Sequence, residues 1–151
     1  MDIDDKLELI FSDVLTEIIS TISGFSFEVL SQEKDNSFED MVGVMSLSGK
    51  TNIMFFVSAK ETDMRILCSY ITGIPQDEVT KSDAEDALCE LVNMAAGSAK
   101  LRLSGSDYVY TLSSPFAVKG QNMSIAAKNK TRVISRVLGN DEISVKLKLV
   151  H

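Results

Sequence analysis

The chain has 151 residues, of which 44% are hydrophobic and 25% charged, and this length and composition are typical of one compact domain. Its net charge of −7, with 15 scattered lysines and arginines, argues against a nucleic-acid partner. No segment approaches the ~20 apolar residues of a membrane span, and the acidic start is unlike the basic start of a secretory signal. We therefore expect a cytoplasmic protein with neither a nucleic-acid nor a membrane partner.

The sequence offers few residues for metal or nucleophilic chemistry. Cys68 and Cys89 lie among apolar residues and outside any Cys-x-x-Cys motif, which favours buried, reduced thiols. The single histidine is His151, so neither a histidine-based triad nor a zinc site is expected. No Gly-x-Ser-x-Gly motif is present either. We expect no metal ion and no cofactor of the chain's own.

Apolar periodicity predicts helices in three places. Apolar residues recur every three or four positions from 3 to about 23, where Gly24 ends the pattern. A shorter stripe covers 61–71 and is followed by helix-breaking residues. The longest helix is expected from about 82 to 103, because Ser82 and Glu85 have the spacing of a capping box.

Strands are indicated where apolar and polar residues alternate. They are expected at 25–29, 41–47, 52–57, 132–138 and 143–149, with an irregular stretch at 109–119 that Pro115 interrupts. The polar stretch 31–37 is expected to be a surface loop, and 48–50 a tight hairpin turn.

The sequence repeats itself at an offset of 73 positions. Residues 13–20 (DVLTEIIS) match 86–93 (DALCELVN), and Gly24 and Gly97 keep the same register. Chance similarity between two helices is the alternative to duplication. Because each copy opens a helix that strands follow, we expect a single α+β domain, a two-layer α/β sandwich over 1–151. It would contain two pseudo-symmetric α-β-β-β-like units, with two long helices on one face of a mainly antiparallel sheet.

Polar and small residues line one face of the longest predicted helix. Asp86, Glu90, Asn93, Gly97 and Lys100 follow one another at steps of four, three, four and three. A solvated helix face is the ordinary interpretation. However, Asn and Gly inside a helix cost roughly 0.5 and 1 kcal/mol relative to Ala, which favours a surface against which another protein docks. Close packing of Gly97 against the sheet is the alternative.

This pattern resembles the signature of the CheC/CheX/FliY phosphatases. The resemblance rests on Asp-x-x-x-Glu-x-x-Asn at 86–93, on its continuation to Gly97 and on Pro115 further along, and it spans essentially the whole chain. Ser20 stands where a second active asparagine would be, so the sequence is most similar to the one-site, CheX-like branch. The degenerate copy formed by Glu17 and Ser20 is expected to be inactive.

The resemblance implies a phosphatase that hydrolyses the aspartyl phosphate of a CheY-like response regulator, in chemotaxis or another two-component pathway. Mg²⁺ would belong to the regulator's own site. Asn93 would position the attacking water and Glu90 would dock to the regulator's lysine, while Asp86, Gly97 and Lys100 would contact the partner. A homodimer through an exposed sheet edge is implied as well. The alternative is a non-catalytic adapter or flagellar-switch-like module that uses the same helix face.

Overall fold

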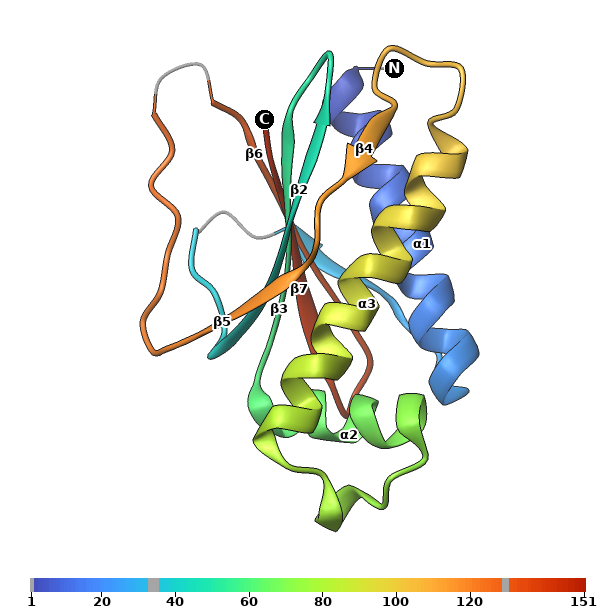
Figure 1. Ribbon diagram of the computed structural model, residues 1–151, viewed down its shortest axis with the longest axis vertical. Helices are drawn as coiled ribbons and strands as arrows, with labels where there is room; N and C mark the ends of the chain where they lie inside the picture. The colour runs from blue at the N-terminus through green and yellow to red at the C-terminus, as the bar shows by residue number, and fades with distance from the viewer. Residues whose placement is uncertain (1, 33–35, 129–130) are drawn as a thin grey trace.

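A computed structural model of the protein describes residues 2–32, 36–128 and 131–151. In this part of the chain, three α-helices pack with a seven-stranded sheet (Figure 1). The helices are α1 (Ile3–Ser23), α2 (Glu61–Thr72) and α3 (Lys81–Arg102), with a short 3-10 helix η1 (Gln76–Glu78) between the last two. The strands are β1 (Glu28–Gln32), β2 (Met41–Gly49), β3 (Ile53–Ala59), β4 (Tyr110–Leu112), β5 (Phe116–Lys119), β6 (Val133–Gly139) and β7 (Ser144–Val150).

The three helices predicted from apolar periodicity are confirmed, with one correction at the start of α3. Gly24 and Gly73 end α1 and α2 in left-handed conformations, with φ of 73° and 77°. The capping box of α3 is formed by Thr80 and Asp83, so the prediction from Ser82 and Glu85 is wrong. Thr80 is the last extended residue before the helix, and Asp83 stands three positions later, where its carboxylate reaches back to the Thr80 backbone.

The sheet is antiparallel in all six of its described ladders. The strand order is β1-β6-β7-β3-β2-β4. β5 also pairs with β2, at residues 41–44, whereas β4 pairs with residues 47–49. The order is symmetric about the central pair β3 and β7: β2 beside β3 corresponds to β6 beside β7, and the edge strand β4 corresponds to β1. Two related units, each of which lends one edge strand to the other's side of the sheet, would give this order. The duplication itself stays a prediction.

Three of the predicted strand regions need correction. Residues 25–27 precede β1, which instead takes in 31 and 32 from the predicted loop; 33–35 lie outside the described residues. The hairpin between β2 and β3 turns at 50–52 because β2 extends to Gly49. The irregular stretch 109–119 forms two short strands, β4 and β5, both paired with β2 and separated at 113–115. Pro115 falls in that separation, as its missing N–H requires.

The two long helices cover one face of the sheet (Figure 1). The stripe of α3 that faces the sheet is buried and consists of small and aliphatic residues, Ala84, Leu88, Leu91, Ala95 and Ala99 among them. Gly43 of β2 lets α3 approach closely, because a Cβ at this position would lie 2.6 Å from Val92 Cγ2 and 3.1 Å from Leu88 Cγ. The opposite face of α3 therefore points away from the sheet. None of the described helices is long and apolar enough to cross a membrane.

Candidate functional site

The predicted ridge of α3 lies on the outside of the molecule. Asp86, Glu90 and Asn93 are exposed, and Gly97 and Lys100 are half-buried. Because the sheet-facing stripe of α3 is buried, its helical period turns these five residues outward. α1 flanks one side of α3 and the edge strands β4 and β5 flank the other (Figure 1).

Glu90 and Asn93 have no partner in the part of the chain that the structure describes. Among residues 2–32, 36–128 and 131–151, neither side chain forms a hydrogen bond or an ion pair. They stand one helical turn apart, so a carboxylate and a carboxamide project side by side into solvent. An uncommitted carboxamide can accept one hydrogen bond through its oxygen and donate others through its nitrogen.

Gly97 leaves a bare patch of backbone on this ridge. A Cβ built at Gly97 meets no atom within 4 Å beyond the neighbouring turns of its own helix, so the alternative that Gly97 packs closely against the sheet is wrong. Its backbone is helical, since Gly97 is not among the residues with positive φ. Neither packing nor backbone conformation therefore requires glycine here, although glycine weakens a helix interior.

Two shallow hollows flank the ridge, and they differ in character. The hollow toward α2 has a volume of about 310 Å³ and carries three carboxylates. It is lined by Ile71, Thr72, Asp83, Asp86, Ala87 and Glu90. The hollow toward α1 has a volume of about 290 Å³ and is mainly apolar. It is lined by Glu17, Ile18, Thr21, Ile22 and Met94.

Tyr110 anchors the middle of α3 and was not found from the sequence. Its side chain is buried, and its hydroxyl donates a 2.7 Å hydrogen bond to the carbonyl oxygen of Ala96, next to Gly97. Burial raises the pKa of Tyr110 well above its usual range, so the hydroxyl stays a donor. Glu85 of α3 is further tied to Lys119 of β5 at 2.6 Å. These contacts fix α3 against the sheet edge while its ridge stays open.

The degenerate copy on α1 is arranged differently. Glu17 is exposed, but its carboxylate lies 2.6 Å from the guanidinium of Arg102, at the end of α3. Ser20 is half-buried, and its carbonyl oxygen accepts the hydrogen bond from Gly24 that closes α1. The sequence gives no hint of this ion pair because its two residues are 85 positions apart.

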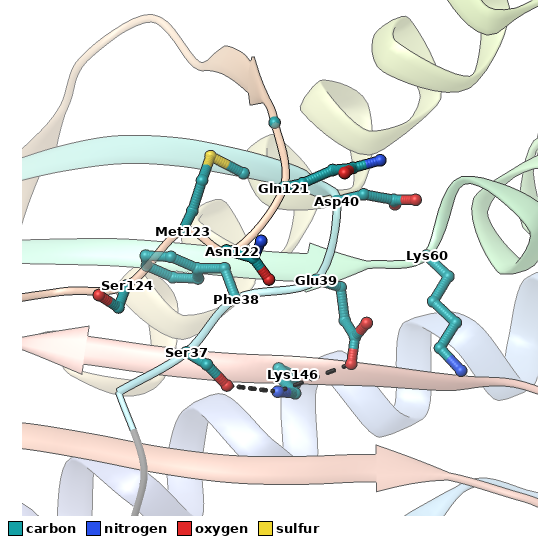
Figure 2. A pocket seen from close by; sticks show the side chains of 11 residues that line it. Ser37, Phe38, Glu39, Asp40, Lys60, Gln121, Asn122, Met123, Ser124 and Lys146 are labelled. Carbon is teal, nitrogen blue, oxygen red and sulfur yellow. Dashed lines mark hydrogen bonds and ion pairs between the residues drawn. The ribbon is translucent and has the colours of Figure 1, made fainter.

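A larger cavity than these two hollows lies away from this ridge, on the other face of the sheet (Figure 2). It has a volume of about 680 Å³, and no α3 residue lines it. Lys146 Nζ lies 3.1 Å from Ser37 Oγ and 3.6 Å from Glu39 Oε1, while Asp40 accepts a 2.7 Å hydrogen bond from the Glu61 backbone N–H. These contacts hold residues 37–40 against β7 and the start of α2, so they stabilise the fold.

The described residues contain no group of three or more His, Cys, Asp or Glu side chains that could hold a metal ion. Cys68 is buried as predicted, Cys89 is only half-buried, and both are unpaired. Burial raises the pKa of both thiols, which keeps them protonated and poorly nucleophilic. His151 Nε2 lies 2.7 Å from an Asp4 carboxylate oxygen and joins the end of the chain to α1, far in sequence from the α3 ridge.

Comparisons with known proteins agree with this architecture. A CheC-like superfamily protein from Shewanella sp. PV-4 has a TM-score of 0.82 and 22% identity, with 99% of this chain and 98% of the other covered. The chemotaxis protein CheX from Desulfovibrio desulfuricans has a TM-score of 0.81 and 20% identity, with 97% and 99% covered. At these identities the similarity establishes the fold. A search of curated protein sequences gives no significant match.

A third similar structure is a complex. It contains CheX, CheY, BeF3 and Mg²⁺ from Borrelia burgdorferi, and it matches with a TM-score of 0.75, 16% identity and 94% and 96% of the two chains covered. The sequence itself matches the profile of the chemotaxis phosphatase CheX over residues 41–137, more than half of the chain, including β2, β3 and all of α3. The protein therefore belongs to the CheX chemotaxis phosphatase family.

Proposed function

We propose that the protein hydrolyses the aspartyl phosphate of a CheY-like response regulator, with Asn93 as the residue that positions the attacking water. The observation that carries the proposal is the Asn93 carboxamide, which is exposed in the middle of α3, has no partner among the described residues and lies one turn from Glu90. Membership of the CheX family supports a phosphorylated CheY-like substrate. The proposal places the protein in the cytoplasm, where such regulators work.

The proposed chemistry requires little of the enzyme beyond positioning. Water attacks phosphorus, the bond to the aspartate oxygen breaks, and inorganic phosphate and a free carboxylate leave. The regulator supplies a lysine and Mg²⁺ that stabilise the developing negative charge. Asn93 accepts a hydrogen bond from the water and donates one to a phosphoryl oxygen, so it orients the nucleophile without taking its proton. Such positioning is worth roughly 10²-fold, or about 3 kcal/mol.

Glu90 is proposed to dock to the active-site lysine of the regulator. It stands one turn before Asn93 on the same ridge, so an ion pair to that lysine would guide the carboxamide into the phosphate site. A charge pair that an interface removes from water contributes more to alignment than an exposed pair does. Asp86, Gly97 and Lys100 extend the same contact surface along α3. The CheX–CheY complex from Borrelia burgdorferi supports a partner of this kind.

The test is phosphate release from several receiver domains that a small-molecule phosphodonor has phosphorylated. We expect the wild-type protein to accelerate release from at least one of them, and Asn93→Ala to lose roughly 10²-fold of that acceleration while it still binds the receiver. Ser20→Ala, at the corresponding position of α1, is the matched control and should behave as the wild type. Unchanged turnover in Asn93→Ala would remove the water-positioning role. Binding without accelerated release would identify a non-catalytic adapter.

We also propose a homodimer formed through an open sheet edge. β1 is the outermost strand on its side of the sheet, and Val29 and Leu30 are 46% and 48% exposed there. An edge strand with exposed apolar side chains readily pairs with another strand. Sedimentation equilibrium that shows a monomer at all concentrations would contradict this proposal.

A further inference from the structure

The two flanks of the α3 ridge differ in their chemistry. Toward α2, the hollow beside Glu90 carries the carboxylates of Asp83 and Asp86 as well. Toward α1, the hollow begins at Met94, directly after Asn93, and its only ionisable lining residue is Glu17. Arg102 holds that carboxylate at 2.6 Å, which compensates its charge. A partner that covers Asn93 would therefore meet acidic groups on one side and an apolar surface on the other.

A further exposed apolar side chain lies nearer the C-terminal end of α3. Leu101 is 78% exposed, more than any other large hydrophobic residue of the described chain. It follows Gly97 by four positions, so it stands one turn further along the same ridge. One exposed leucine alone would need no explanation. Leu101, however, stands one turn after the bare backbone of Gly97 and about two turns after Met94, on the same helix. We call this surface the apolar flank; it consists of Ile18, Thr21, Ile22, Met94 and Leu101.

We infer that the apolar flank binds an apolar side chain that the response regulator presents beside its phosphorylation pocket, and that this contact selects among regulators. The inference rests on the proposed function, because the regulator must already lie over Asn93. Three observations favour this occupant. The flank is continuous with the catalytic ridge, its one carboxylate is neutralised by Arg102, and Gly97 lets a partner approach the helix between Asn93 and Leu101.

The inference also gives the partner an orientation. A regulator whose lysine meets Glu90 and whose phosphate meets Asn93 would extend along α3 toward its C-terminal end, over α1. A regulator with a polar or charged side chain at the matching position would lose the apolar contact and would have to bury that group against Ile22 and Met94. Burying a polar group without a hydrogen bond is unfavourable, so such a regulator would bind more weakly.

The experiment measures affinity separately from catalysis. Binding of phosphorylated receiver domains is titrated by calorimetry in the Asn93→Ala background, where hydrolysis is slow. Leu101→Asp and Thr21→Lys change exposed positions of the flank and should not disturb folding. We expect Leu101→Asp to weaken binding about tenfold, the effect of losing one buried apolar contact, and Thr21→Lys to weaken it similarly by placing a charge in the apolar hollow, while Leu101→Met should keep most of the affinity. In the Asn93-containing protein, the same substitutions should raise KM and leave kcat unchanged.

Leu9→Asp is the matched control. Leu9 is 47% exposed on α1 and stands eight positions before Glu17, about two turns away from the flank. This variant should bind as the wild type does. If Leu101→Asp and Thr21→Lys also bind as the wild type does, the flank is not a contact and the inference is wrong, while accelerated phosphate release would still support the proposed function. If no receiver binds the wild-type protein, both fail together.

Discussion

The helices α1 and α3 carry the same pattern of acids and end up with different chemistry. On α3, Glu90 and Asn93 face solvent without a partner among the described residues. On α1, the carboxylate of Glu17 is held by Arg102 at 2.6 Å, and Ser20 is half-buried near the end of the helix. The second copy therefore lacks both the amide and a free carboxylate. Ser20 offers no carboxamide, and the neighbouring glutamate serves a structural ion pair.

The two glycines at matching positions show the same divergence. Gly24 adopts φ of 73° and ends α1, whereas Gly97 is an ordinary helical residue inside α3, which runs on to Arg102. An asparagine one turn before a helix end would sit on a fraying segment. In α3, helical turns lie on both sides of Asn93. The hydrogen bond from the Tyr110 hydroxyl to the Ala96 carbonyl oxygen anchors the helix nearby. A helix interior, rather than a helix end, thus holds the carboxamide that we propose positions the water, and precise positioning would require such support.

Replacing the two glutamates tests the largest expected difference between the copies. Glu90→Gln should raise the concentration of phosphorylated receiver needed for half-maximal rate about tenfold, because one charge pair to the receiver's lysine is lost. Glu17→Gln, the matched control, removes only an exposed ion pair with Arg102 and should leave this concentration unchanged. Steady-state phosphate release over a range of receiver concentrations measures both. A change confined to the maximal rate of Glu90→Gln would argue against docking.

Replacing the two glycines by alanine should shift stability in opposite directions. Gly97→Ala should raise the free energy of unfolding by about 1 kcal/mol, since alanine favours the helix and the added Cβ meets open space. Gly24→Ala should lower it by about 1 kcal/mol, since φ of 73° is unfavourable for a residue with a Cβ. Urea unfolding measures both values. If both substitutions changed the free energy of unfolding in the same direction, the two glycines would have the same structural role, and the comparison would be wrong.

Much of the fold and the ridge could be predicted because both follow from local periodicity. The spacing of apolar residues located α1, α2 and α3, and the alanine and leucine stripe of α3 determined that Asn93 points outward. The start of α3 was misplaced because Ser82 and Glu85 match the usual capping-box pattern more closely in sequence than Thr80 and Asp83 do. The extended backbone of Thr80 shows that the helix begins after this residue.

The contacts that sequence reasoning missed join distant parts of the chain. The hydrogen bond from Tyr110 to Ala96 depends on where β4 meets α3, and the ion pair from Glu17 to Arg102 depends on how α1 crosses it. Neither contact follows from the spacing of residues along one helix or strand. The apolar flank was missed for the same reason, because Ile22 and Met94 become neighbours only when the two helices pack.

The starts of the two helices give the smallest expected effect, which depends on pH. At α1 the N-cap residue Asp2 makes no capping hydrogen bond through its side chain, whereas at α3 Thr80 and Asp83 bond each other reciprocally at 3.0 and 3.1 Å. The backbone N–H of Thr80, and then its side chain, hold the pKa of Asp83 below its usual range. A carboxyl whose pKa is lower in the folded state stabilises the protein above its unfolded pKa of about 3.9.

This contribution should disappear as the pH falls through the folded pKa of Asp83, because the folded and the unfolded carboxyl are then both protonated. Asp83→Asn should therefore unfold at a slightly lower urea concentration than the wild type between about pH 5 and 7, and the difference should close below about pH 4. Thr80→Ala keeps the backbone N–H and removes only the hydroxyl. It should lower stability across the whole range while keeping most of the acid dependence. If the Asp83→Asn difference were the same at every pH, the carboxylate charge would not contribute, and the cap of α3 would stabilise the helix by geometry alone.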